Sequence, residues 1–259
     1  MKAMIFAAGL GTRLKPLTDT MPKAMVPVAG TPLVGHVLGR LREAGCADIV
    51  VNVHHFGDQI IRYLSDRDWG LPVRISDERD CLLDTGGGIL HAEALLRDPD
   101  ACAPGRFLVH NVDILSNLDI RQFAGQAPAE ALSTLVVSER DTRRYFLFRE
   151  EAGPSDLPPR LRLVGWTNIA TGEVRTPFAD LDVASCRPLA FAGIHLMSEG
   201  IFDAMRALGF AGKFSITDFY LAACARYPIY GVVPPDFRML DVGKPASLAA
   251  AETFLAGIG

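Results

Sequence analysis

The sequence predicts an α/β protein with a doubly wound, mainly parallel, Rossmann-like sheet and a small antiparallel insertion. Two observations predict this fold class. In the first half of the chain, short apolar runs typical of buried strands alternate with helical patterns. Over residues 130–190, strand-like runs follow one another, with arginine- and proline-rich breaks between them. No repeat or linker-like stretch divides the 259 residues, so we expect a single domain over 1–259, with the insertion as a substrate lobe.

The alternating half opens with a strand at 3–6, an apolar run that ends in Ala-Ala-Gly and therefore leads into a loop. A helix is predicted at 33–44, because apolar residues recur there at helical spacing until Gly45 ends the pattern. The same signals predict strands at 49–53, 73–75 and 107–109, and helices at 58–64 and 87–96.

The second half contains the insertion and a mixed C-terminal third. Strands are predicted at 132–137, 145–148, 161–166, 188–197 and 238–240, and helices at 201–208, 216–226 and 246–255. The segment 153–159 is rich in proline and is predicted to be a break between antiparallel strands. We expect this insertion to form one wall of a binding site.

Composition limits the classes of function. The chain is 49% hydrophobic and 22% charged, with a formal net charge of −4, so it is neither disordered nor broadly attractive to nucleic acid or anionic membranes. No run approaches the about 18 apolar residues of a membrane helix, and the N-terminal run is too short for a signal peptide. Five cysteines occur singly, without a CxxC pair, so we expect reduced thiols and a cytoplasmic location.

A glycine-rich loop follows the first predicted strand, with the sequence Ala-Ala-Gly-Leu-Gly-Thr-Arg over residues 7–13. Glycines let backbone N–H groups approach an anion, and Arg13 adds a fork of donors suited to phosphate oxygens. The GK[ST] ending of a Walker loop and the third glycine of the dinucleotide fingerprint are both absent. On its own, Gly-x-Gly also fits a tight strand-to-helix turn.

The loop continues as G-x-G-T-R-L-x-P-L-T over 9–18 and P-K-x-x-x-P-V over 22–28, which resembles the signature of sugar-1-phosphate nucleotidyltransferases. The resemblance extends to segments 50–55, 85–88, 111–113, 191–195 and 241–245. It implies that an oxygen of a sugar 1-phosphate attacks the α-phosphorus of a nucleoside triphosphate and releases pyrophosphate. The C-terminal β-helix repeats of bifunctional relatives are absent from the sequence, so acetyltransferase activity is not expected.

The resemblance implies roles for the cations and backbone of these segments. Arg13 would clamp the β- and γ-phosphates, and Lys23 would bridge the α-phosphate and the incoming sugar phosphate. The implied nucleotide-binding residues are Ala8, Gly9, Gly11, Thr12, Asp77, Thr85, Gly86 and Gly87. Nothing in their spacing selects the base, and a flexible loop is an alternative for the glycines of 85–88.

Two aspartates are the candidate metal ligands. Asp113 follows the strand predicted at 107–109, and Asp241 follows the strand predicted at 238–240. By resemblance the pair would hold one Mg²⁺ against the α-phosphate. Taken alone, Asp113 also fits the cap of a helix near 117–123. Many relatives have glycine at Val112 and threonine at Lys244, which changes the backbone near the site but leaves both carboxylates in place.

The sugar pocket is implied to involve Asn111, Gly193 and Asp218, with Ser215 better explained as a helix cap. Some relatives place a lysine on the sugar phosphate through a Glu-Lys-Pro triplet, which here is Val-Gly-Trp over 164–166. The tryptophan of that triplet fits either a sugar-stacking residue or a half-buried core residue. The isolated histidines lack the spacing of a zinc site, so none is assigned to metal.

The expected partners are a nucleoside triphosphate and a sugar 1-phosphate, without nucleic acid or membrane. In its short length and in the absence of this lysine, the chain resembles the uridylyltransferases of peptidoglycan recycling, which act on N-acetylmuramate 1-phosphate. Its similarity to mannose-1-phosphate guanylyltransferases is nearly as high. A choline-phosphate cytidylyltransferase would need a cage for quaternary ammonium that the sequence does not reveal. A non-catalytic nucleotide-sugar sensor is disfavoured because Arg13, Lys23, Asp113 and Asp241 are all present. A homo-oligomer is compatible with the sequence.

Overall fold

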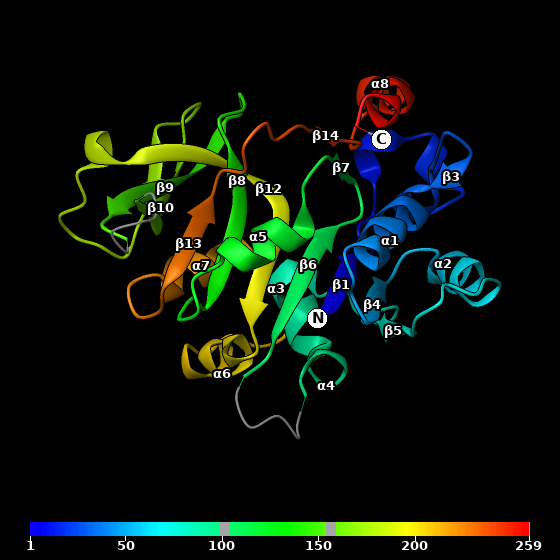
Figure 1. Ribbon diagram of the computed structural model, residues 1–259, viewed down its shortest axis with the longest axis horizontal. Helices are drawn as coiled ribbons and strands as arrows, with labels where there is room; N and C mark the ends of the chain where they lie inside the picture. Colours follow the sequence, from blue (N-terminus) through cyan, green and yellow to red (C-terminus); the bar gives the residue numbers. More distant parts are fainter. Residues whose placement is uncertain (99–103, 154–158, 259) are drawn as a thin grey trace.

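A ten-stranded mixed sheet forms the centre of the protein, in a computed structural model that describes residues 1–98, 104–153 and 159–258. Its strand order is β11-β10-β13-β8-β12-β6-β1-β4-β5, and β9 pairs with both β10 and β12 (Figure 1). The predicted break at 153–159 lies mostly outside the described residues. The α/β fold class is confirmed.

Four adjacent strands make the parallel half of the sheet: β5 (Val73–Asp77), β4 (Asp48–Val53), β1 (Lys2–Phe6) and β6 (Arg106–Asn111). Each lies where apolar and β-branched runs predict a strand. In the register, Phe6 lies between Asn52 and Asn111, so the carboxyl ends of β1, β4 and β6 meet at one edge. Open parallel sheets bind ligands at that edge.

The other part of the sheet is mainly antiparallel, apart from one parallel pair of its strands, and extends beyond the insertion predicted over residues 130–190. It comprises β8 (Ser133–Ser138), β9 (Arg144–Glu151), β10 (Arg160–Asn168), β11 (Glu173–Arg175), β12 (Arg187–Ser198) and β13 (Ile229–Val232). Long strand β12 joins the halves, because it runs antiparallel to both β6 and β8. Strand β13 was not predicted, since it has four residues and Gly231 interrupts its apolar run.

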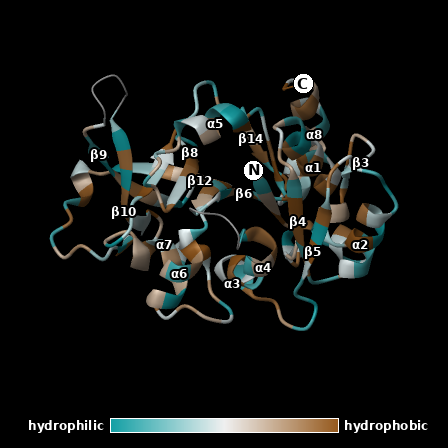
Figure 2. Ribbon diagram, turned by 60° about the horizontal axis from the view of Figure 1, so that its bottom comes forward, coloured by the Kyte–Doolittle hydropathy of each residue, from teal (hydrophilic) through white to brown (hydrophobic). Residues whose placement is uncertain are grey.

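Helices cover both faces of the sheet (Figures 1 and 2). One face carries α1 (Leu33–Glu43), α2 (Gly57–Ser65), α5 (Ile120–Gln126) and α8 (Pro245–Ala256); the other carries α3 (Asp84–His91), α4 (Glu93–Leu96), α6 (Gly200–Ala207) and α7 (Ile216–Ala223). In β1, Ala3 and Ile5 join the first core while Met4 joins the second, as the period of a strand requires. The helix predicted at 87–96 divides at Ala92 into α3 and α4.

Two short ribbons lie outside the main sheet. Strand β2 (Pro27–Val28) pairs with β3 (Thr31–Pro32), and β7 (Ile114–Ser116) pairs with β14 (Met239–Asp241). The second ribbon aligns Asp241 with Ile114, the residue after Asp113. It therefore brings together two carboxylates that are far apart in the sequence. None of the described helices is long and apolar enough to cross a bilayer.

Candidate active site

The glycine-rich loop after β1 turns back on itself through three single-turn 3₁₀ helices, η1 (Thr12–Leu14), η2 (Leu17–Asp19) and η3 (Lys23–Met25). Gly11 has φ 65°, and a Cβ there would lie 2.9 Å from the Thr18 methyl group and 3.0 Å from Cβ of Lys23. The Thr18 hydroxyl donates to the Gly11 carbonyl at 2.9 Å. A glycine at 11 therefore lets the loop close around Lys23, and the simple strand-to-helix turn is excluded.

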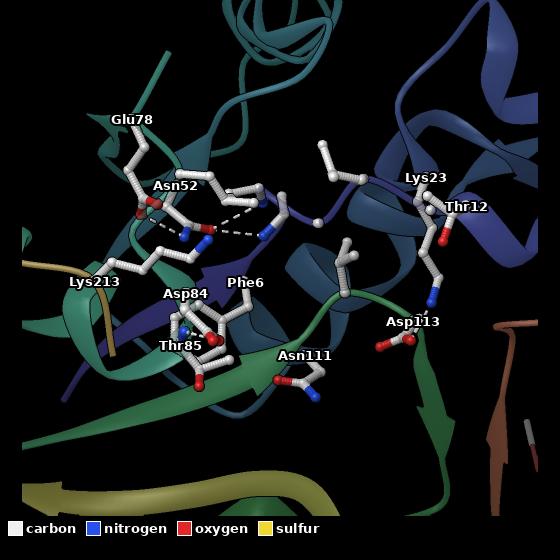
Figure 3. A pocket seen from close by; sticks show the side chains of 17 residues that line it. Phe6, Thr12, Lys23, Asn52, Glu78, Asp84, Thr85, Asn111, Asp113 and Lys213 are labelled. Carbon is white, nitrogen blue, oxygen red and sulfur yellow. Dashed lines mark hydrogen bonds and ion pairs between the residues drawn. The ribbon is translucent and has the colours of Figure 1, made fainter. Parts of the chain in front are cut away.

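A cleft of about 440 Å³ opens at the carboxyl ends of the parallel strands (Figure 3). It is lined by residues 6–12 together with Lys23, Asn52, Glu78, Leu82, Asp84, Thr85, Asn111, Val112, Asp113 and Lys213. Eight of the predicted site residues line it: Ala8, Gly9, Gly11, Thr12, Lys23, Thr85, Asn111 and Asp113. The volume is within the range of small-ligand sites.

Asn52 and Glu78 form a buried amide–carboxyl pair that holds the glycine-rich loop in place. Oδ1 of Asn52 accepts hydrogen bonds from the backbone N–H groups of Ala7 at 2.7 Å and Ala8 at 3.3 Å. Nδ2 of Asn52 donates to Oε1 of Glu78 at 2.7 Å, and burial raises the pKa of Glu78. The pair connects the glycine-rich loop to the segment before α3, so the two walls of the cleft are fixed relative to each other.

Asp113 and Asp241 lie together at the end of the β7–β14 ribbon, where the Val242 N–H donates to the Asp113 carbonyl at 2.8 Å. Lys23, only 8% exposed, forms an ion pair with Oδ2 of Asp113. The alternative role of Asp113 as a helix cap is wrong, because Asp119 caps α5 and accepts from the Gln122 N–H at 2.9 Å.

Of the two aspartates, Asp241 is the one whose ionised form is disfavoured by its surroundings. Its Oδ1 is buried and has no hydrogen-bond partner among the described residues. Burial raises the pKa of Asp241, repulsion from Asp113 raises it further, and Lys23, Arg13 and Arg140 oppose the increase. A buried oxygen without a donor beside a second carboxylate fits a divalent cation, and Mg²⁺ commonly takes one or two carboxylates with substrate phosphates and waters. No cluster of three or more candidate ligands occurs in residues 1–98, 104–153 and 159–258.

Arg13 does not line the cleft but lies beside this carboxylate. A Cβ built on Gly243 would be 2.8 Å from Nη2 of Arg13 and 2.6 Å from Oδ1 of Asp241. The absence of a side chain at 243 therefore allows the guanidinium and the carboxylate to approach each other. Each aspartate thus has a cation beside it, Lys23 at Asp113 and Arg13 at Asp241.

Gly86 and Gly87, two of the predicted nucleotide-binding residues, pack against another segment of the chain. Both backbone N–H groups donate to the Phe214 carbonyl, at 2.9 and 3.1 Å, and neither residue lines the cleft. A Cβ on Gly86 would lie 2.3 Å from the Phe214 ring, and a Cβ on Gly87 would lie 2.2 Å from the Gly212 carbonyl oxygen. These glycines instead allow the segment 212–214 to pack against the start of α3.

This packing positions Lys213, a cleft residue that the sequence reasoning missed. Its side chain extends from the 212–214 segment into the cleft near Asn52 and Glu78 (Figure 3). In the described part of the chain it forms no ion pair. Its position directly before the Phe-Ser-Ile-Thr-Asp motif of 214–218 is the signal that could have identified it.

Gly87→Ala is expected to lower the free energy of unfolding by about 1–3 kcal/mol, because the methyl group overlaps a backbone carbonyl that cannot move independently. Thermal unfolding measures the effect. Gly39→Ala is the matched control, since a Cβ at this α1 position meets nothing within 4 Å and removes only a helix-weakening glycine. Equal stability of the two variants would contradict the packing role.

Two predicted site residues lie outside the cleft in ion pairs. Asp77 pairs with Arg79 at 2.6 Å, and the hydrogen bonds from Arg79 lower the pKa of Asp77. Asp218 pairs with Arg175 at 2.7 Å. Salt bridges therefore occupy both carboxylates, and the partner of Asp218 is distant in the sequence, so motif spacing does not reveal it. Ser215 is the predicted cap, and it accepts from the Thr217 N–H at 3.1 Å.

Gly193 and Asn111 meet at the boundary between β12 and β6. Gly193 has φ 74° and lies in a bulge of β12, where a Cβ would be 2.6 Å from Nδ2 of Asn111. Next to the bulge, His195 bonds the Tyr220 hydroxyl at 2.6 Å, and burial lowers the pKa of His195 to about 3. His195 is therefore neutral at physiological pH and fixes the bulge from the core side. Trp166 is half-buried, with the Arg175 guanidinium 5.8 Å from its ring centroid.

The fold and cleft define a class: an α/β protein with a glycine-rich loop, a buried lysine and a carboxylate pair at the strand ends. Comparison with known proteins agrees. A sequence model of the family described as "Nucleotidyl transferase" matches residues 2–147. The chain belongs to this family and is a sugar-1-phosphate nucleotidyltransferase.

Individual relatives extend this finding. The chain is 35% identical over 261 residues to the N-acetylmuramate alpha-1-phosphate uridylyltransferase of Caulobacter vibrioides, covering 98% of this chain and 96% of that protein. It is 31% identical over 144 residues to a mannose-1-phosphate guanyltransferase of Candida albicans, covering 54% and 38%. A solved UDP-glucose pyrophosphorylase complexed with UDP-glucose has 20% identity and a TM-score of 0.73, covering 99% of this chain and 98% of that one, which supports the fold.

Proposed function

We propose that this enzyme transfers the uridylyl group of UTP to N-acetylmuramate 1-phosphate, giving UDP-N-acetylmuramate and pyrophosphate. The observation that supports this substrate pair is the similarity to the Caulobacter uridylyltransferase along 98% of the chain. The mannose-1-phosphate guanyltransferase similarity covers 54% of the chain and 38% of that protein, so it supports the reaction class more than the substrate.

The reaction forms a bond from the sugar phosphate oxygen to the α-phosphorus and breaks the α–β phosphoanhydride bond. Both reactants are anionic, and the nucleophile is deprotonated at neutral pH, so alignment and charge neutralisation are the main requirements. In our proposal the backbone of Ala8, Gly9, Gly11 and Thr12 binds the nucleotide together with Thr85, and Arg13 holds the leaving pyrophosphate. Lys23 neutralises charge between the α-phosphate and the acceptor.

Asp113 and Asp241 are the proposed ligands of one Mg²⁺. The ion would neutralise charge on the α-phosphate when bound. The support is the buried Oδ1 of Asp241, which has no donor among the described residues, and the repulsion between the two carboxylates that raises the pKa of Asp241. On the acceptor side, Asn111 and the bulge at Gly193 border the proposed sugar pocket.

A crossed substrate panel tests this proposal. UTP, GTP, CTP and dTTP are each combined with N-acetylmuramate, N-acetylglucosamine, glucose and mannose 1-phosphates, and pyrophosphate release is followed with Mg²⁺ or with a chelator. We expect the highest kcat/KM for UTP with N-acetylmuramate 1-phosphate. Preference for GTP with mannose 1-phosphate would replace the substrate assignment, and release unaffected by chelator would contradict the metal assignment.

We also propose that the enzyme acts in the cytoplasm, where nucleoside triphosphates are available, and without nucleic acid or membrane partners. The net charge of −4 supports the absence of general attraction to polyanions. A homo-oligomer is compatible with this proposal, and size-exclusion chromatography with light scattering measures it.

A further inference from the structure

Arg140 is an exposed cation on the loop between β8 and β9 that is not among the cleft-lining residues. Its Nη2 donates to the Phe191 carbonyl at 3.1 Å. Within the described part of the chain, the Arg140 side chain makes no other hydrogen bond and no ion pair. A guanidinium carries five N–H donors, so most of those of Arg140 are available to a ligand.

The contact with Phe191 anchors Arg140 at the acceptor side of the site. Phe191 begins the bulge of β12, because the register with β8 shifts between Phe191 and His195. Gly193 lies inside this bulge and faces Asn111, which lines the cleft. Arg140 is therefore held beside β12, the strand that borders the proposed sugar pocket, and β6 separates this strand from β1 and its glycine-rich loop.

Arg140 comes from a different part of the chain than the other cations of the site. Lys23 and Arg13 belong to the segment that follows β1, whereas Arg140 comes from the β8–β9 loop. The site thus has cations on the nucleotide side and a separate cation beside the strand that borders the acceptor side.

A neighbouring arginine on the antiparallel half is not available in the same way. Arg175 forms an ion pair with Asp218 at 2.7 Å and lies over the Trp166 ring. Releasing it for a ligand would leave the Asp218 carboxylate without that partner. Arg140 has no such commitment among the described residues.

We propose that Arg140 binds an anionic group of the acceptor, either its 1-phosphate or a carboxylate attached to the sugar. The inference rests on the proposed function, in which the acceptor brings its own negative charge to a cleft whose loop cations face the triphosphate. N-acetylmuramate 1-phosphate carries both groups, because its lactyl ether ends in a carboxylate. A guanidinium fork matches the paired oxygens of either group.

Arg140→Gln and Arg140→Lys test this inference in the full-length enzyme, with Arg143→Gln as the matched control on the same exposed loop. KM is measured separately for UTP and for N-acetylmuramate 1-phosphate. N-acetylglucosamine 1-phosphate, which lacks the lactyl carboxylate, is tested as a substrate or a competing ligand. For Arg140→Gln we expect the acceptor KM to rise about 10–100-fold and the UTP KM to change less than about 2-fold. Arg140→Lys should retain part of the acceptor binding, and Arg143→Gln should match wild type.

The two acceptors distinguish the two anionic groups. A loss confined to N-acetylmuramate 1-phosphate identifies the carboxylate, and an equal loss for both acceptors identifies the phosphate. An unchanged acceptor KM, or a UTP KM that rises as much as the acceptor KM, would overturn the inference. Wild-type enzyme without uridylyltransferase activity would overturn the proposed function instead, which keeps the two failures separate.

Discussion

Asp241→Asn is expected to lower turnover by about 10²–10³-fold, the typical loss when one transition-state electrostatic group is removed, and at the same time to stabilise the metal-free protein. The amide has the same shape but no charge, so it is a poor ligand for Mg²⁺. It also removes the repulsion from Asp113 that raises the pKa of Asp241. Loss of activity combined with a gain in stability is the signature of a carboxylate retained for function.

The stability gain should depend on pH in a defined direction. A carboxyl group whose pKa is higher in the folded than in the unfolded protein stabilises the fold below the unfolded value, and this contribution is lost as pH rises through the folded value. At neutral pH, well above the unfolded value, the raised pKa of Asp241 therefore destabilises the native state. The Asp241→Asn variant should exceed wild type in Tm by about 2–4 °C per kcal/mol gained, and the difference should shrink as the pH approaches about 4.

Thermal unfolding of both proteins between acid and neutral pH, in chelator and in Mg²⁺, measures this effect. Wild type should gain stability on addition of Mg²⁺ and the variant should not. Asp119→Asn is the control, because asparagine caps a helix about as well as aspartate and Asp119 does not line the cleft. A variant with normal turnover, or one less stable than wild type at neutral pH without metal, would contradict our interpretation of Asp241.

The fold was predictable where its signals are local. Short apolar and β-branched runs located the strands of the parallel half, and apolar residues at helical spacing located its helices. The β7–β14 ribbon is different: each strand has three residues, and the pairing depends on the chain returning after a long interval. Its consequence, two aspartates side by side, was expected from family resemblance and could not be obtained from periodicity.

The candidate site was predictable where one continuous motif builds it. Residues 7–12 of the glycine-rich loop and Lys23, which follows in the same motif, line the cleft together with Asp113. Lys213 enters it only because the Gly86 and Gly87 N–H groups hold the 212–214 segment against α3. Tertiary contacts also decide which predicted site residues lie outside the cleft, as for Asp218 in its salt bridge with Arg175. Such partners lie outside the motif, so spacing alone cannot identify them.

Lys23→Ala is expected to reduce turnover by about 10²–10³-fold and, in contrast to Asp241→Asn, to destabilise the protein. The ammonium is the ion-pair partner of Asp113, with side-chain exposures of 11% and 16%. Without the ammonium, the negative charge of Asp113 faces that of Asp241 uncompensated. Loss of a charged hydrogen bond of this kind typically lowers the free energy of unfolding by about 2–3 kcal/mol. Turnover and thermal unfolding of the purified variant measure the two effects.

The double variant Lys23→Ala/Asp113→Asn separates catalysis from stability. Neutralising Asp113 removes the negative charge that Lys23→Ala leaves unpaired. The double variant should therefore recover most of the unfolding free energy lost in Lys23→Ala while remaining inactive. Near-normal turnover of folded Lys23→Ala would eliminate the proposed role of the ammonium between the α-phosphate and the acceptor. Stability that fails to recover in the double variant would mean that Lys23 supports the loop through its packing against Gly11. The opposite stability effects at Lys23 and Asp241 follow from one arrangement, a cation and a carboxylate on either side of Asp113, and both must be observed for that arrangement to be correct.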